Sequence, residues 1–165
     1  MMERLERLKL KTFTRESIRK QCNIWRFRGL KIVFTNGCFD LLHLGHIEYL
    51  SRAADLGNEL IIGLNSDLSV KRIKGPERPI NPEQARAALL ASLSCVSAIV
   101  VFDEDTPYNL ICTIKPDILV KGADYKIDEI AGYDVVLAAG GQVITIPFTE
   151  GYSSSLLIDK IKDRL

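Results

Sequence analysis

Residues 32–46 read IVFTNGCFDLLHLGH, and this stretch indicates how the chain folds. It begins with a short run of apolar and β-branched residues, passes through a turn that contains a glycine, and ends with two histidines. Beyond it, Ile47, Leu50 and Ala54 recur at helical spacing up to Gly57, a residue that is typical of a helix end. The stretch therefore predicts a buried strand, a tight turn and the entry of a helix.

The same alternation of strand and helix continues along the chain. Four more apolar runs follow, at residues 60–64, 98–102, 118–120 and 143–146. We expect helices between and after them: one from Asn81-Pro82 to Leu93, one that begins at Thr106-Pro107, one over residues 133–139, and a C-terminal one with Leu157, Ile161 and Leu165 on its apolar face. Several runs are apolar throughout, as expected when helices cover both faces of a parallel sheet. The sequence therefore predicts an α/β protein with a doubly wound parallel sheet of about five strands.

The first 29 residues lie outside this alternation. We expect one N-terminal helix there, with Ile24 and Trp25 packed on the rest of the chain. The predicted organisation is a helical extension over residues 1–29 and an α/β domain over residues 30–165, which is an ordinary length for a single domain.

Charge and cysteine usage exclude several classes of protein. With 22 basic and 21 acidic side chains the net charge is +1, so no general nucleic-acid or membrane surface is indicated. Cys22, Cys38, Cys95 and Cys112 are far apart, which favours reduced, mostly buried thiols over a zinc site. The charged first residues lack a signal peptide, and no stretch approaches the roughly 20 apolar residues of a membrane span. We expect a cytoplasmic protein that provides no metal site of its own.

The two histidines mark the candidate site. In a doubly wound sheet, ligands bind beyond the carboxyl ends of the strands, where the strand order reverses. His43 and His46 follow the first predicted strand at the start of a helix, where free N–H groups and the helix dipole favour an anion. Gly37 and Gly45 leave room for a phosphate, and imidazoles can donate hydrogen bonds to phosphoryl oxygens. The alternative is an incidental pair, one capping and one exposed.

Well-known phosphate loops are absent from the sequence. There is neither a Gly-x-Gly-x-x-Gly after the first predicted strand nor a Gly-x-x-x-x-Gly-Lys-[Ser/Thr]. A nicotinamide dehydrogenase and a P-loop kinase are therefore disfavoured.

Two further polar stretches are candidates for phosphate binding. Lys71, Arg72 and Lys74 form a predicted loop of cations after the second strand, able to neutralise a triphosphate, although a solvated charge run is the plainer interpretation. Residues 151–155 open the last helix, where serines are usually caps. Capping and phosphate binding are compatible at this position, because a ligand can satisfy the same helix start.

The residues after the fourth predicted strand lie at the same edge of the sheet. Gly122 would let a ligand approach Lys121, and Asp124 could hydrogen-bond a ribose or a base, unless these residues form only a surface turn. Asp40, between the first strand and the histidines, is expected to orient the turn rather than to act as a base.

These motifs resemble those of a known group of enzymes. Asn36-Gly-Cys-Phe-Asp40 followed by His43-Leu-Gly-His46 resembles the signature of the HxGH nucleotidyltransferase superfamily. Over roughly residues 24–163 the chain is most similar to the D-glycero-D-manno-heptose 1-phosphate adenylyltransferases, the adenylyltransferase part of ADP-heptose synthases. The motifs that carry this resemblance include Asn65-Ser-Asp67, Lys71-Arg-Ile-Lys-Gly75, Arg78-Pro79, Glu104-Asp-Thr-Pro107, Lys121-Gly122, Asp124-Tyr125, Glu150-Gly151 and Ser153-Ser-Ser155. Phe148 stands where glycerol-3-phosphate cytidylyltransferases have an arginine, which disfavours glycerol as the acceptor.

The resemblance implies an activity and a set of roles. It implies a Rossmann-like nucleotidyltransferase fold and transfer of AMP from ATP to a heptose 1-phosphate, with Mg²⁺ bound to the ATP. Because the chain is too short to include a sugar kinase, we expect the stand-alone form, and the resemblance implies a homodimer. His43, His46 and Lys74 would be catalytic. Asn36, Gly37, Cys38, Phe39, Asp40, Gly45, Lys71, Lys121, Gly122, Asp124, Gly151, Tyr152, Ser153, Ser154 and Ser155 would bind the nucleotide, and Asn65, Asp67, Arg72 and Arg78 the acceptor.

Other functions stay open from the sequence. Within the superfamily, the chain could be a cytidylyltransferase for glycerol 3-phosphate or a related polyol phosphate, or an adenylyltransferase that makes FAD or dephospho-CoA. From a different class, it could be a non-catalytic nucleotide-binding module. The joint presence of the histidines, the cations and the serines disfavours that last alternative.

Overall fold

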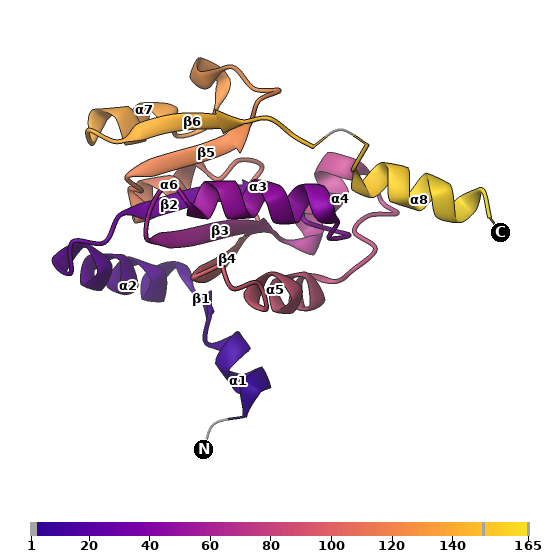
Figure 1. The fold of residues 1–165 in the computed structure, drawn as a ribbon, viewed down its shortest axis with the longest axis horizontal. Coiled ribbons are helices and arrows are strands. Elements are labelled where there is room, and N and C mark those ends of the chain that lie inside the picture. Colours follow the sequence, from indigo (N-terminus) through magenta and orange to yellow (C-terminus); the bar gives the residue numbers. More distant parts are fainter. Residues whose placement is uncertain (1–2, 150, 165) are drawn as a thin grey trace.

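The chain folds around one parallel sheet, as seen in a computed structural model that describes residues 3–149 and 151–164 (Figure 1). In chain order the elements are α1 (Arg4–Lys9), β1 (Thr12–Phe13), α2 (Arg15–Phe27), β2 (Ile32–Gly37), α3 (Leu44–Ala54), β3 (Glu59–Asn65), α4 (Asp67–Lys74), α5 (Glu83–Ala91), β4 (Ala98–Phe102), α6 (Tyr108–Ile114), β5 (Ile118–Gly122), the short 3₁₀ helix η1 (Ile127–Glu129), α7 (Tyr133–Ala138), β6 (Gln142–Ile146) and α8 (Ser154–Lys162). Within the described residues, six strands lie in the order β1-β4-β3-β2-β5-β6, and all neighbouring pairs are parallel. The predicted α/β class is confirmed.

The sheet has one strand more than the sequence predicted. Thr12 and Phe13 form β1 at its edge, where Thr12 pairs with Ile99 of β4. A strand of two residues shows no periodicity from which it could be predicted. The prediction of a single N-terminal helix was wrong for the same reason, since α1 and α2 lie on either side of this strand.

Helix α2 packs on the sheet through Ile18, Cys22 and Trp25, which are buried at helical spacing. The predicted burial of Trp25 is confirmed. The predicted packing of Ile24 was wrong, because this residue is 51% exposed. It lies next to Trp25 in sequence, and therefore roughly 100° around the helix from it.

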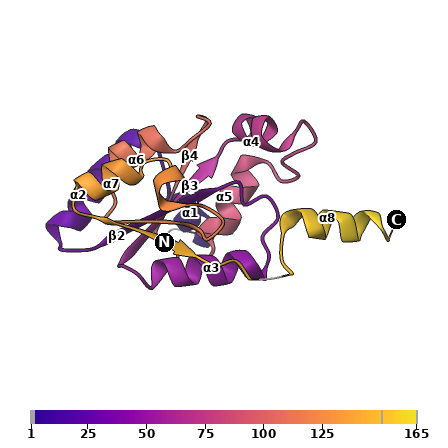
Figure 2. The same ribbon diagram turned by 90° about the horizontal axis from the view of Figure 1, so that it is seen from above.

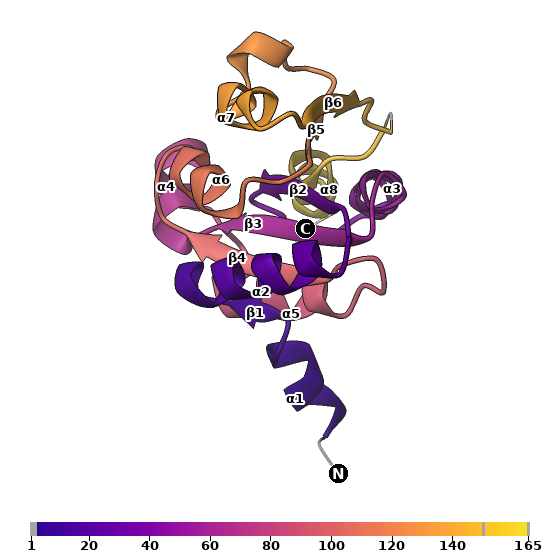
Figure 3. The same cartoon turned by 90° about the vertical axis from the view of Figure 1, so that its left-hand side faces the viewer.

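Helices cover both faces of the sheet (Figure 3). Helices α3 and α5 pack on one face, where Leu50 of α3 joins Ile62 of β3 in one core cluster. Helices α2, α6 and α7 cover the other face, where Leu110 of α6 joins Ile61 of β3 in a second cluster. Successive residues of β3 thus point into opposite cores, which is why this strand is apolar throughout.

The strand order reverses at β2. From β2 the chain moves outward to β3 and β4, and it then returns to the other side of β2 with β5 and β6. The carboxyl ends of β2 and β5 therefore lie side by side at the point where such folds bind ligands.

Two local predictions differ from the structure. Lys71, Arg72 and Lys74 lie on helix α4 rather than in a loop. Asn81 does not cap α5, whose N-cap is Pro82, and its amide donates instead to the carbonyl of Asp40. The second difference arises because contacts with Asp40 in the turn after β2 determine the position of Asn81.

Helix α8 also differs from its prediction. It projects away from the sheet and buries no residue within the described part of the chain (Figure 2). Ile161, which was predicted to be on a packed apolar face, is 55% exposed, and Leu165 lies outside the described residues. None of the helices in residues 3–149 and 151–164 is long and apolar enough to cross a membrane.

The four cysteines are free thiols. Only Cys22 is buried, whereas Cys38, Cys95 and Cys112 are partly exposed, so the prediction of mostly buried thiols was wrong. Burial raises the pKa of the Cys22 thiol to about 11.

Candidate active site

A cavity of about 680 Å³ lies at the carboxyl edge of the sheet, beside the switch point. Its walls come from the segments that follow β2, β4 and β5, from the last turn of α4, and from the stretch between β6 and α8. Eighteen residues that the sequence predicted for the site line it: Asn36, Gly37, Cys38, Phe39, Asp40, His43, Gly45, His46, Asn65, Lys74, Arg78, Lys121, Gly122, Asp124, Tyr152, Ser153, Ser154 and Ser155. In the described part of the chain, the predicted residues that do not line it are Asp67, Lys71, Arg72 and Gly151.

The two histidines lie together at the start of α3. His43 occupies the N-cap position, but its side chain makes no capping bond, and His46 follows in the first turn. Their rings stack with centroids 3.8 Å apart. Among the described residues, the buried Nδ1 atoms of both rings and the Oδ1 of Asn36 have no hydrogen-bond partner. Buried polar atoms are almost always paired in proteins, so three unpartnered atoms at one cavity are typical of a ligand site.

Both imidazoles are neutral at pH 7. Burial lowers the pKa of His43, and burial together with the nearby His43 lowers the pKa of His46 to about 4. A neutral imidazole has one N–H donor and one acceptor nitrogen. The pair can therefore donate hydrogen bonds to phosphoryl oxygens, and a bound anion would raise both pKa values.

The start of α8 lies against the histidine turn. The ring of Tyr152 is 6.3 Å from that of His43, and Ser154 Oγ donates to the carbonyl of Leu41 at 3.1 Å. A Cβ at Gly45 would lie 3.1 Å from the Cβ of Tyr152, so a larger residue would press on the start of α8. Ser153 caps α8 by accepting from the N–H of Leu156. The histidines and the serines thus line the same cavity from adjacent segments.

The turn between β2 and the histidines is strained and firmly held. Phe39 has a φ of 45°, in the left-handed region, which costs about 1–3 kcal/mol for a residue with a bulky side chain. The next residue, Asp40, is buried, and its carboxylate accepts from Arg78 Nε at 2.6 Å and from the N–H groups of Ile80 and Asn81. Although burial alone would raise the pKa of Asp40, these hydrogen bonds hold it below its ordinary value. These contacts suit an orienting role rather than that of a base.

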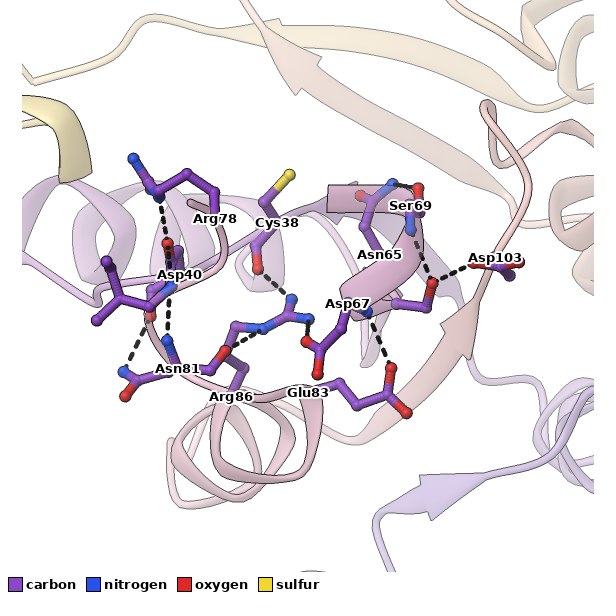
Figure 4. Close-up of polar contacts among 12 residues, drawn as sticks. Cys38, Asp40, Asn65, Asp67, Ser69, Arg78, Asn81, Glu83, Arg86 and Asp103 are labelled. Carbon is purple, nitrogen blue, oxygen red and sulfur yellow. Dashed lines mark hydrogen bonds and ion pairs between the residues drawn. The ribbon is translucent and has the colours of Figure 1, made fainter. Parts of the chain in front are cut away.

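Two of the predicted acceptor ligands contact protein instead. Asp67 accepts from the buried Arg86 at 2.7 Å (Figure 4). Arg72 donates to Asp105 at 3.0 Å. Asn65 lines the cavity and donates through its Nδ2 to Ser69 Oγ. Of the three cations on α4, Lys74 alone lines the cavity.

The end of β5 forms the opposite wall. Lys121 is partly buried, which lowers its pKa, and its Nζ lies 5.0 Å from the centre of the Tyr125 ring. A Cβ at Gly122 would overlap the ring of Phe148 and lie 2.6 Å from Asp124 Oδ1. The glycine therefore allows an aromatic ring to lie directly on the strand end.

Several residues of the site were missed from the sequence. Asp105 and Thr106 line the cavity after β4, where the rule on strand ends could have indicated them. Tyr49 lines it from α3, and its ring lies 5.8 Å from that of Phe148. The buried Arg86 lies beside the site without lining it, and an arginine within a helix gives no signal in the sequence that it is buried. Glu150, part of the quoted resemblance, lies outside the described residues.

Comparison with known proteins agrees with this geometry. Residues 34–160 match the cytidylyltransferase-like family. The chain belongs to this family. It is accordingly a nucleotidyltransferase, and the cavity lies where the family motif and the strand order meet.

Similar proteins include curated bacterial ones and a solved structure. The chain is 53% identical over 150 residues to "Bifunctional protein HldE" of Syntrophotalea carbinolica, and 51% identical over 152 residues to that of Caulobacter vibrioides. These matches cover 91% and 92% of this chain but only 31% and 32% of the relatives, so the chain spans about a third of their length. A lipopolysaccharide core biosynthesis protein from Thermoplasma volcanium is 34% identical with a TM-score of 0.60, and the match covers 76% of this chain and all of that one.

Proposed function

We propose that this chain transfers AMP from ATP to a heptose 1-phosphate, giving ADP-heptose and pyrophosphate. One observation above all supports it: two stacked imidazoles with unpartnered nitrogens and the serine-led start of α8 line a single cavity. The motifs that resemble heptose 1-phosphate adenylyltransferases support the choice of acceptor, as do the similarities to HldE and to a lipopolysaccharide core biosynthesis protein.

The proposed step is a direct displacement at phosphorus. An oxygen of the sugar phosphate attacks the α-phosphorus of ATP, the bond from that phosphorus to the bridging oxygen breaks, and pyrophosphate leaves. The attacking oxygen is already ionised at neutral pH, so the enzyme mainly positions the reactants and neutralises charge. His43 and His46 donate to the phosphoryl oxygens as charge develops.

Other groups around the cavity neutralise and position the two substrates. Lys74 and Lys121 supply positive charge from opposite walls. The N–H groups at the start of α8, beside Ser154, bind the outer phosphates. Arg78, whose Nε pairs with Asp40, binds the phosphate of the acceptor.

The donor groups at the cavity also indicate how Mg²⁺ would bind. The groups proposed to contact the phosphates are imidazoles and ammonium groups, whereas Mg²⁺ prefers oxygen ligands. Among residues 3–149 and 151–164, no three His, Cys, Asp or Glu side chains gather as a metal site. We propose that the ion enters with ATP and is held mainly by phosphate oxygens and water, where it neutralises the triphosphate.

The test is a panel of nucleotides and acceptors with pyrophosphate release as the readout. ATP with a heptose 1-phosphate should give the highest turnover. Strong activity with CTP and glycerol 3-phosphate, and none with ATP and a heptose 1-phosphate, would overturn the choice of substrates. Nucleotide binding without pyrophosphate release from any acceptor would overturn the catalytic function. The resemblance also implies a homodimer, which stays a prediction that sedimentation would test.

A further inference from the structure

Arg86 is a buried cation that contacts three segments around the cavity without lining it. Its side chain is 0% exposed. It donates from Nη1 to the carbonyl of Cys38 at 2.6 Å, from Nε to the carbonyl of Asn81 at 3.0 Å, and from Nη2 to Asp67 Oδ1 at 2.7 Å (Figure 4). A buried guanidinium is stable only with such partners, and its planar group fixes their relative positions.

The first partner belongs to the strained turn. Cys38 immediately precedes Phe39, whose φ is 45°. Arg86 holds the carbonyl on one side of Phe39, while the carboxylate of Asp40 on the other side accepts from the backbone of residues 80 and 81. A residue persists in a strained conformation only where its surroundings over-determine it. Arg86 therefore helps to fix the turn that leads to His43 and His46.

Another partner of Arg86, Asp67, belongs to α4, the helix that carries Lys74. Asp67 is the first residue of α4, and α5 holds it twice: Arg86 donates to its carboxylate, and Glu83 Oε2 accepts from its N–H at 3.0 Å. Lys74 is the last residue of the same helix, roughly 10 Å further along its axis. A tilt at Asp67 would move the ammonium group of Lys74 away from the cavity.

We infer that Arg86 is a positioning residue for the nucleotidyl transfer, which holds the histidine turn and helix α4 at a fixed separation. The inference rests on the proposed function, and it assigns Asp67 to the support of Arg86 rather than to the acceptor. Arg86 touches no reacting atom, so its loss should act through the placement of His43, His46 and Lys74.

The experiment compares three single variants with the wild type. Arg86→Lys keeps the charge but loses the planar group, and Asp67→Asn weakens the ion pair from the other side. Arg26→Lys is the matched control, because Arg26 donates to the carbonyls of Ile114 and Lys115 at the opposite edge of the sheet. For each variant, ATP affinity is measured by calorimetry and kcat by pyrophosphate release, at a temperature where circular dichroism shows the variant folded.

We expect a kcat about 10- to 100-fold lower in Arg86→Lys, since small misplacements of reacting groups have effects of this size. We also expect a smaller loss in Asp67→Asn, weaker ATP binding in both, and values within twofold of wild type in Arg26→Lys. If Arg86→Lys and Asp67→Asn both kept kcat and ATP affinity within twofold, the inference would be wrong. If Arg86→Lys did not fold, Asp67→Asn alone would decide. A wild type that releases no pyrophosphate contradicts the proposed function alone, because ATP affinity in the variants needs no acceptor.

Discussion

The turn after β2 and the start of α8 face the same cavity, but they are held very differently. The turn is fixed by the Asp40 carboxylate, which is 1% exposed and bonded to Arg78, Ile80 and Asn81, and by the buried Arg86. Helix α8 buries no residue in the described part of the chain, and at its start Ser154 donates a single hydrogen bond to the carbonyl of Leu41.

This difference indicates how the two halves of the site work. The histidine half of the site, which is the turn after β2 with His43 and His46, is formed before any ligand binds, because buried charges fix it. The serine half has few contacts that oppose its movement, as expected of segments at the low end of local stability. We therefore expect a bound triphosphate to tighten the start of α8 while leaving the histidine turn almost unchanged.

The largest effect should follow the loss of an imidazole. His46→Ala should lower kcat by about two to three orders of magnitude with a smaller change in KM, because it removes a donor that acts mainly in the transition state. His46→Gln, which keeps an N–H donor, should retain more activity. Near-normal turnover in His46→Ala would remove the histidines from the mechanism.

The contribution of Asp40 to the turn after β2 can be measured as a free energy of unfolding. Asp40→Asn should lower the free energy of unfolding by about 3 kcal/mol in urea titrations, because it leaves Arg78 without its buried partner. Asp105→Asn is the control, since the Asp105 side chain is 82% exposed where it pairs with Arg72, and no measurable change is expected. Equal effects in the two variants would mean that the turn is not specially anchored.

As the pH falls, protonation of His46 should lower the free energy of unfolding before protonation of Asp40 does. The pKa of His46 is about 4 in the folded chain against an ordinary 6.5, so the unfolded chain binds this proton more readily. The contribution of His46 to stability is therefore complete above pH 6.5 and is lost as the pH falls towards 4. The pKa of Asp40 lies below its ordinary value of 3.8, so its contribution to stability is lost only at a lower pH than that of His46. Urea midpoints between pH 7 and pH 4.5 should fall less in His46→Gln than in the wild type, and identical curves would contradict this.

The smallest effect is expected at α8. Ser154→Ala removes one hydrogen bond to Leu41 and one hydroxyl from the cavity, so the KM for ATP should rise about 2- to 10-fold with little change in unfolding free energy. Ser92→Ala is the control, because Ser92 Oγ makes a similar bond to the carbonyl of Leu89 away from the cavity. An unchanged KM in Ser154→Ala would place the hydroxyl outside the nucleotide site.

The sequence predicted the parts of this molecule that depend on local patterns. Apolar runs such as residues 98–102 predicted the buried strands. The position of His43 and His46 after a strand predicted the edge of the sheet at which the cavity lies, because strand ends in this class of fold converge on one edge. Lys74, to which the resemblance gives a catalytic role, also lines this cavity, whereas Lys71 does not.

What could not be predicted depends on contacts between distant segments. Asp67 and Arg72 look like ligands in the sequence, but the fold places Arg86 and Asp105 beside them, and each charge is neutralised within the protein. The pattern of α8 resembles that of a packed helix, yet none of its described residues is fully buried. The charge of a residue indicates in the sequence that it needs a partner, but the identity of that partner depends on the fold.

The most direct test of the central claim uses the chain's only two histidines as probes. Imidazole NMR signals of His43 and His46 are recorded before and after addition of Mg²⁺ and a non-hydrolysable ATP analogue, with binding verified by calorimetry. Both signals should shift and both pKa values should rise, because the triphosphate is expected to lie against the stacked rings. Unchanged histidine signals with the analogue bound would mean that the phosphates bind elsewhere, and the proposed site would be wrong.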